Sequence, residues 1–349
     1  MVKDKFNASI IGVGRIGFTF QFDKKREQPA SHSIALKKNK NIKLTAACDI
    51  DKDKLSLWKK HYNKSKVYIS IKDFLKNEKS DIIVIAVNED SHLDITLKAI
   101  KKQPKLIILE KPIAPNIKEA LLIKKYSEKF NVPICINHER RYSIDYQITK
   151  KLIEEKKLGD VESVIASFWS GAKVYKKGSE KYGDCSLIHD GTHLIDIIDY
   201  LFDIKFDKPK INKISFDDGK NVTFLNVFFN EKIYDQKEKT LFNLEFSGNK
   251  KVFGFELDIR GTMGRVVIGN GYLNFYERKS SPYYKGFYSL VRNKKIKRPK
   301  LTKYFSNMVS NCVNFLQGKE PLVSNVSTGV KVIEIIYKII SKLKKYFDI

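Results

Sequence analysis

The sequence is poor in cysteine and in long apolar runs, and each shortage excludes a class of protein. Its 349 residues include four cysteines, at positions 48, 135, 185 and 312, and no pair has the C-x-x-C spacing of a zinc or redox site. The longest aliphatic stretches, such as 82–87, fall far short of the roughly 20 residues that cross a bilayer. The first 17 residues show no secretory signal. We therefore expect reduced thiols in the cytoplasm, no membrane partner and no metal site.

Acidic residues and arginine are also scarce. The chain has 40 Asp and Glu against 66 Lys and Arg, for a formal net charge of +26, and only nine of the basic residues are arginine. Arginine is the residue whose planar fork reads phosphates and guanines in nucleic-acid-binding proteins. The lysines are scattered, and the densest basic segment, 292–303, is expected to be a solvated loop. This pattern argues against a nucleic-acid partner and leaves a local positive field for small anionic ligands.

The sequence does have enough apolar residues, 42%, to bury sizeable cores, and its length is typical of two domains. Short aliphatic runs alternate with amphipathic stretches in the first third of the chain. The runs are 8–13, 43–48, 81–87, 106–109 and 132–136. Strands that are buried on both faces and separated by helices predict a parallel, doubly wound sheet.

The pattern changes after about residue 137. A helical stretch at 146–156 leads to a strand at 161–168, and runs rich in β-branched and aromatic residues follow, separated by glycine-containing turns. We predict an α/β fold with a Rossmann domain over residues 1–137. A second, α+β domain with a large, mostly antiparallel sheet is predicted over residues 138–349. Whether its C-terminal helices pack on the first domain is left open.

A G-x-G-x-x-G motif follows the first predicted strand and is expected to open a helix. Gly12 allows a tight turn, Gly14 lets the backbone approach a pyrophosphate, and Gly17 lets helix and sheet pack closely. The helix N-terminus would then face the phosphates. Asp49 follows the second strand. A carboxylate there accepts hydrogen bonds from the ribose hydroxyls and repels a 2′-phosphate, so NAD is favoured over NADP. The longer crossover at 22–40 separates Asp49 from the glycines, and a solvated surface aspartate is the alternative.

Two further segments carry candidate chemistry. Glu110-Lys111-Pro112 ends the fourth strand, at the edge where doubly wound sheets bind ligands. Farther along, His189, Asp190 and His193 share one face if the segment 186–202 is a single helix. Imidazole takes a hydroxyl proton near neutral pH. A zinc site, which lacks an evident third ligand, and a structural polar cluster are the alternatives for the histidines.

Four segments, taken in chain order, resemble one known family. They are the glycine motif, Glu110-Lys111-Pro112, Arg140-Arg141-Tyr142 and the segment 190–196. It is the family of glucose–fructose oxidoreductase, inositol dehydrogenase and rhizopine catabolism proteins (Gfo/Idh/MocA), and the resemblance covers nearly the whole chain. It implies NAD(P)-linked oxidation or reduction of a secondary alcohol on a carbohydrate, phosphorylated and nucleotide-linked forms included. It also implies a homodimer or homotetramer formed through an open-faced C-terminal sheet.

The resemblance also implies roles for individual residues. Lys111 and His193 would be the catalytic pair, with His189 and Asp190 beside them. The implied cofactor contacts are Gly12, Gly14, Arg15, Ile16, Gly17, Asp49, Asn88, His92, Glu110 and Lys111. The implied substrate contacts are Arg141, Glu139, Tyr182, His189 and His193.

The sequence departs from the family pattern at an informative position. The family often has an aspartate four residues before the catalytic histidine, where this chain has His189, with Asp190 one residue later. Either residue could fill the role, which leaves the proton route and the reaction direction open. Two alternatives to net oxidoreduction therefore stay in view: an NAD-binding sensor without catalysis, and a lyase or glycosidase that uses redox chemistry transiently.

Overall fold

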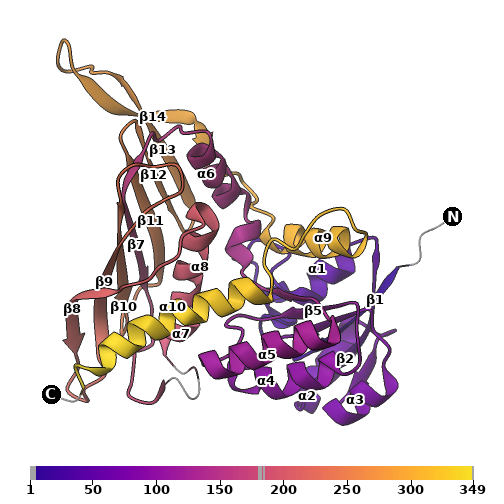
Figure 1. The fold of residues 1–349 in the computed structure, drawn as a ribbon. Helices are drawn as coiled ribbons and strands as arrows, with labels where there is room; N and C mark the ends of the chain where they lie inside the picture. The colour runs from indigo at the N-terminus through magenta and orange to yellow at the C-terminus, as the bar shows by residue number, and fades with distance from the viewer. Residues whose placement is uncertain (1–4, 180–182, 184, 348–349) are drawn as a thin grey trace. The chain divides into compact units, whose positions relative to one another are not determined.

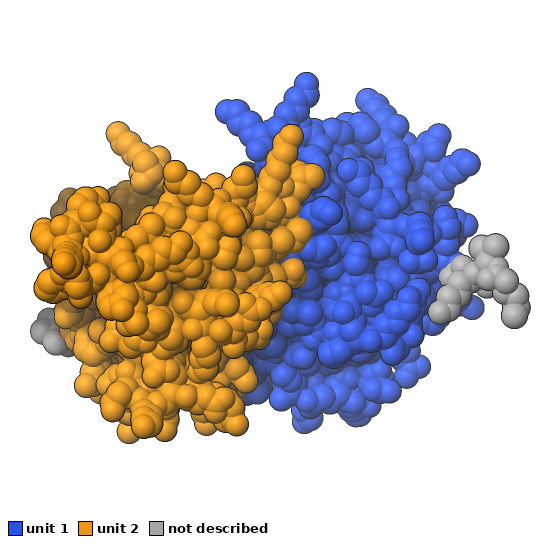
Figure 2. Space-filling model, turned by 90° about the horizontal axis from the view of Figure 1, so that it is seen from above, with its two compact units in different colours: residues 1–142, 303–333 blue, residues 143–302, 334–349 orange. Residues whose placement is uncertain are grey.

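The computed structural model describes residues 5–179, 183 and 185–347 and divides into two compact units. One unit contains residues 1–142 and 303–333, and the other contains residues 143–302 and 334–349 (Figure 2). Figure 1 labels their elements. Tyr182, a predicted substrate contact, lies outside the described residues. Each unit is described separately below.

The first unit contains a six-stranded parallel sheet in the order β3-β2-β1-β4-β5-β6. The strands are β1 (Phe6–Ile11), β2 (Ile42–Cys48), β3 (Lys66–Tyr68), β4 (Ile82–Ile85), β5 (Leu106–Leu109) and β6 (Ile134–Ile136). The central strands β4 and β5 are buried at every residue, as expected for a sheet covered on both faces. The predicted doubly wound sheet is thus confirmed.

Helices cover both faces of this sheet. They are α1 (His32–Lys38), α2 (Lys52–His61), α3 (Ile71–Asn77), α4 (His92–Ile100), α5 (Ile117–Phe130) and α9 (Tyr304–Leu316). One core cluster joins strand residues such as Ile10 and Val84 to Trp58 of α2 and Phe305 of α9. Helix α9, from the end of the chain, packs beside α1 in this way because its apolar residues recur at helical spacing. On the other face α4 contacts β4, β5 and α5.

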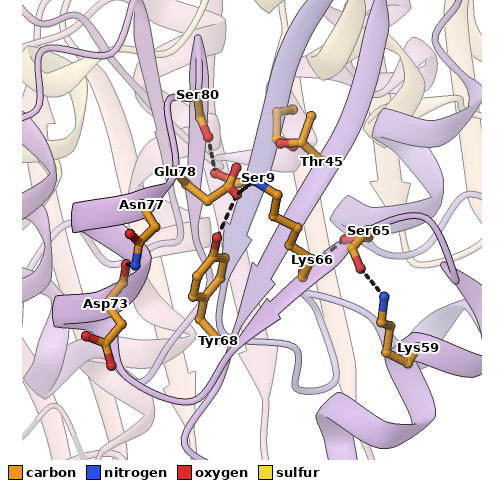
Figure 3. A network of polar contacts seen from close by, with 11 residues as sticks. Ser9, Thr45, Lys59, Ser65, Lys66, Tyr68, Asp73, Asn77, Glu78 and Ser80 are labelled. Carbon is orange, nitrogen blue, oxygen red and sulfur yellow. Dashed lines mark hydrogen bonds and ion pairs between the residues drawn. The ribbon is translucent and has the colours of Figure 1, made fainter.

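Strand β3 was not predicted, because polar contacts rather than an apolar run mark it. Figure 3 shows Lys66 and Tyr68 of this strand reaching Glu78, at 3.0 Å and 2.8 Å respectively. Burial, together with the bond to Glu78, raises the pKa of Tyr68 to about 12. A three-residue strand held by a carboxylate leaves no periodic signal in the sequence.

The second unit is built on an eight-stranded sheet in the order β14-β13-β12-β11-β7-β10-β9-β8. The strands are β7 (Val161–Trp169), β8 (Lys210–Phe216), β9 (Val222–Glu231), β10 (Thr240–Ser247), β11 (Gly254–Gly261), β12 (Gly264–Gly269), β13 (Tyr272–Ser280) and β14 (Tyr288–Lys297). Among the strands that the structure describes in this unit, only β7 and β10 pair in parallel. The predicted large, mostly antiparallel sheet is confirmed.

The prediction of a solvated loop at 292–303 is wrong over its first half, since residues up to Lys297 belong to β14. This strand is at the sheet edge, where lysines protect unpaired backbone groups from aggregation. Figure 1 shows the β13–β14 hairpin extending beyond the neighbouring strands. Helices α6 (Ile144–Glu154), α7 (Ser186–His189) and α8 (Gly191–Phe202) also belong to this unit, and α10 (Val326–Lys344) begins in the first unit and ends in the second.

All four cysteines lie among the described residues, where they are buried and not joined in disulfides. Within residues 5–179, 183 and 185–347, no helix has both the length and the apolar character needed to span a membrane.

Candidate active site

A pocket of about 300 Å³ lies at the carboxyl ends of β1, β2 and β4, where parallel sheets bind ligands. A side chain built on Gly14 would meet nothing within 4 Å, so the backbone here is open to a ligand. The lining residues are Ile11, Gly12, Gly14, Cys48, Asp49, Ile50, Lys54, Ile71, Ala86, Val87, Asn88, Ser91 and Ile95. An open glycine backbone next to a strand-end carboxylate fits a dinucleotide. Four predicted cofactor contacts, Gly12, Gly14, Asp49 and Asn88, border the pocket.

The glycine motif forms the predicted turn, and the helix expected after it is short. Gly12 has a φ of +93°, and a side chain there would approach Ala86 O to 2.3 Å. A helical turn follows, in which Phe18 N–H donates to Gly14 O at 2.9 Å, and it leads into the 3-10 helix η1 (Thr19–Phe22). Helix α1 does not begin until His32. Between η1 and α1 the chain is held by the Gln28 side-chain amide, which donates to Phe20 O and Asp23 O, both at 3.1 Å.

Asp49 binds the backbone of the glycine turn. One carboxylate oxygen accepts the Val13 N–H at 2.8 Å, and the other accepts the Asp51 N–H at 3.0 Å. Each oxygen keeps a further acceptor site for a hydroxyl donor. Lys54 also borders the pocket and pairs with Asp51 at 3.2 Å. No sequence signal marks Lys54, because a lysine in a first helical turn is indistinguishable from any surface lysine.

Glu110 is buried in a polar network. Its Oε1 accepts from His32 Nε2 at 2.5 Å and from Asn137 Nδ2 at 2.6 Å. Burial alone would raise the pKa of Glu110, but the hydrogen bonds from His32 and Asn137 and the charge of Lys111 lower it below its usual value. Sequence reasoning missed His32 and Asn137, since the fold brings them to Glu110 from α1 and from the end of β6.

Replacing Glu110 by Gln should lower the free energy of unfolding by about 1–3 kcal/mol at pH 7, because buried donors lose a charged acceptor. The lowered folded-state pKa makes this stabilisation complete above the unfolded pKa of about 4.3, and it is lost as pH falls through the folded value. Urea unfolding from pH 7 down to about pH 3 measures both effects. Glu128→Gln, which breaks an exposed pair with Lys124, is the control. A deficit that is already smaller at pH 5 than at pH 7 would contradict a lowered pKa for Glu110.

His92 supports the backbone around Lys111. The imidazole is buried, with Nδ1 2.8 Å from Pro112 O and Nε2 3.1 Å from Val87 O. Burial lowers the pKa of His92, although both carbonyl contacts oppose that shift. The ring thereby joins the loop after β4 to the segment after β5. Lys111, next to Pro112, is half-buried.

Two predicted substrate contacts of the first unit differ in exposure. Glu139 is half-buried, and burial raises the pKa of its carboxyl while the charges of Arg140, Lys111 and Arg26 oppose the increase. Arg141 is buried and donates to Val323 O at 3.4 Å. The charges of Glu110, Lys111 and Glu139 therefore act on one another. Arg141 binds the backbone of the segment after α9.

The histidine segment of the second unit is not one helix as expected. Helix α7 ends at His189 and α8 begins at Gly191, where a side chain would lie 3.3 Å from Phe246. His193 N–H donates to Asp190 O at 3.0 Å. His189 is exposed, whereas Asp190 and His193 are half-buried.

Residues 5–179, 183 and 185–347 contain no group of three or more His, Cys, Asp or Glu side chains placed to hold a metal ion.

Residues 6–138 match the model of the oxidoreductase family with an NAD-binding Rossmann fold. The Rossmann domain belongs to the Gfo/Idh/MocA family. The resemblance inferred from the glycine turn and the Glu110-Lys111-Pro112 segment is thereby confirmed.

Curated relatives match this chain at low identity. Glucose-6-phosphate 3-dehydrogenase of Bacillus subtilis is 25% identical over 252 residues, which cover 64% of this chain and 70% of the relative. The NADP⁺-linked scyllo-inositol 2-dehydrogenase IolW of the same species is 24% identical over 147 residues, covering 41% of each chain.

The fold likeness extends over the second unit as well. A dehydrogenase structure from Chromobacterium violaceum has a TM-score of 0.78 at 13% identity and covers 97% of this chain and 96% of that one. At this identity the match shows the fold alone. The family therefore supplies the architecture and the oxidoreductase class, while the chemistry has to be argued from this chain's own residues.

Proposed function

We propose that this Gfo/Idh/MocA protein transfers a hydride between NAD and a secondary hydroxyl or ketone of a sugar, cyclitol or nucleotide sugar. The observation that carries the proposal is the pocket at the ends of β1, β2 and β4, where Gly14 is open and Asp49 borders the cavity. Relatives named as dehydrogenases of glucose 6-phosphate and scyllo-inositol support a polyol substrate. Phosphorylated and nucleotide-linked sugars are included in the proposed class.

Lys111 and His193 are the proposed catalytic pair. When bound, the nicotinamide supplies the hydride acceptor or donor. Lys111 donates a hydrogen bond to the reacting oxygen and stabilises the charge that develops there. His193 takes the hydroxyl proton during oxidation and returns it during reduction. The Pro112 carbonyl held by His92 fixes the backbone from which Lys111 extends.

We propose NAD as the preferred cofactor. Asp49 is fixed by the backbone of Val13 and Asp51, and its charge opposes a 2′-phosphate at the same edge of the pocket. Lys54 also borders the pocket, but its pair with Asp51 is exposed and weak, so the preference rests on Asp49.

We also propose that the protein assembles as a homodimer or homotetramer through the eight-stranded sheet. Three aromatic residues on the projecting β13–β14 hairpin, Tyr283, Tyr284 and Phe287, are more than 60% exposed, which is unusual unless a partner covers them.

The direct test is a panel of glucose 6-phosphate, inositols and nucleotide sugars, each with NAD or NADP, followed by nicotinamide absorbance. NADH formed with one substrate class, at a lower KM for NAD than for NADP, is the expected result. Tight NAD binding without an absorbance change on any substrate would favour the sensor alternative. Product without net NADH would favour the redox-cycling lyase or glycosidase.

A further inference from the structure

A second cavity, of about 330 Å³, lies in the helical layer of the first unit and is here called the helix-layer pocket. It is lined by residues of α1, of the end of α2 and of the segment 21–28. Helices α1 and α2 directly precede β2 and β3, so their last turns lie toward the amino ends of those parallel strands. The pocket assigned to the dinucleotide lies at the carboxyl ends, and the two cavities share no lining residue. The helix-layer pocket is therefore a separate site, with a volume typical of small-molecule sites.

One part of the helix-layer pocket is an aromatic wall. The Phe22 side chain is 45% exposed, and its ring centroid is 4.8 Å from that of His61. Tyr62 also lines the pocket and continues the wall into the core, where its ring centroid is 4.4 Å from that of the buried Trp58. Aromatic rings attract one another beyond the effect of the area they bury. An exposed ring at the edge of a cavity is therefore suited to the flat ring of a ligand.

Hydrogen bonds hold this wall in place. Tyr62 OH donates to Gln21 Oε1 at 2.8 Å, which joins the end of α2 to η1. The side-chain amide of Gln28 donates to two backbone carbonyls of the segment 20–23, both at 3.1 Å, and so fixes the turn that carries Phe22. Groups that are already ordered lose little conformational freedom when a ligand binds. The pocket is thus preorganised.

The charged part of the lining consists of Lys37 and Lys38, in the last turn of α1. The Lys37 ammonium is 5.1 Å from the ring centroid of Tyr62. None of the eight lining residues is acidic, and within the part of the chain that the structure describes no salt bridge joins either lysine to a carboxylate. In neighbouring α2, by contrast, Lys54 pairs with Asp51 at 3.2 Å. Two such ammonium groups beside an aromatic wall favour a ligand that has both a ring and a negative charge.

We propose that the helix-layer pocket binds an aromatic carboxylate. The flat ring lies against Phe22 and His61, and the carboxylate accepts hydrogen bonds from Lys37 and Lys38. A neutral aromatic compound leaves both ammonium groups without a charged acceptor, and an aliphatic carboxylate leaves the aromatic wall without a stacking partner. The site goes beyond the proposed function, because it needs neither the nicotinamide nor a sugar.

Calorimetric titration of the intact protein with 2-naphthoate tests the site. In the two comparison probes, 2-naphthamide keeps the ring without the charge, and cyclohexanecarboxylate keeps the charge without an aromatic ring. Each titration is repeated at saturating NAD. The variants are Phe22→Leu and the double variant Lys37→Gln/Lys38→Gln. The matched control is Lys24→Gln/Lys25→Gln, which removes two exposed lysines of the adjoining segment that do not line the pocket.

Wild type is expected to bind 2-naphthoate at least about tenfold more tightly than either comparison probe, with the same affinity at saturating NAD. The Lys37/Lys38 double variant should weaken 2-naphthoate about tenfold and Phe22→Leu about fivefold, with the control within about twofold of wild type. Absence of binding, equal affinity for the acid and its amide, an equal loss in the control, or competition with NAD would overturn the proposal. None of these titrations depends on turnover, so a protein that oxidises no sugar would contradict the proposed function alone.

Discussion

Replacing Lys111 by alanine is expected to abolish measurable turnover, a loss of at least about 10³-fold in kcat, while the Kd for NAD changes by only a few-fold. The reason is that the ammonium is proposed to act on the reacting oxygen, so it contributes most in the transition state. The dinucleotide pocket is lined by other residues, and Lys111 is not among them. Steady-state kinetics together with a fluorescence titration of NAD measures both quantities.

Lys105→Ala is the matched control, because Lys105 flanks the same strand β5 at its other end, where it pairs with Asp81 at 2.9 Å. Lys111→Met adds a second comparison that keeps the apolar stem and removes only the charge. Both Lys111 variants should be inactive, whereas Lys105→Ala should retain wild-type kcat. Turnover in Lys111→Met close to wild type would remove Lys111 from the catalytic pair. A parallel loss of NAD binding would instead make it a cofactor contact.

The parallel sheet was predictable because its strands are continuous apolar runs. Strands such as Ile82–Ile85 are buried on both faces, and burial of that kind leaves a strong compositional signal. Strand β3 and the edge strand β14 lack it, since their residues are polar or basic and their pairing depends on neighbours. The same property made residues 292–297 resemble a solvated loop.

The candidate site was predictable as a set of segments rather than as a set of contacts. The glycine turn, Asp49 and the Glu110-Lys111 pair are encoded at strand ends, where position along the chain already implies position in the sheet. The partners of Glu110 are not, because His32 and Asn137 reach it through the fold over 78 and 27 residues of sequence. The crossover at 22–40 was expected to be long, but the path of its first part depends on the side chain of Gln28 and on Lys303, which no local pattern reveals.

Replacing His193 by alanine is expected to lower kcat by about 10²–10⁴-fold, the usual contribution of a general base. Loss of the imidazole should also flatten the acidic limb of the pH–rate profile for alcohol oxidation, since the group that must be deprotonated is gone. The helix should survive the change. Residues such as Leu194 and Ile197 of α8 are fully buried, whereas His193 is only half-buried, so the core does not depend on it. Kinetics across pH, with circular dichroism as a check on folding, is the measurement.

His61→Ala is the control for a histidine lost from a helix elsewhere, at the exposed end of α2. Asp190→Asn and His189→Ala then separate the two residues that compete for the family aspartate's role. Asp190 directly precedes α8, and its backbone carbonyl accepts the His193 N–H. Asp190 is also one residue closer in sequence to His193 than His189 is. If it orients His193, Asp190→Asn should lower kcat and shift the acidic limb, whereas His189→Ala should act mainly on KM. An unchanged pH profile in His193→Ala would show that the proton leaves by another group.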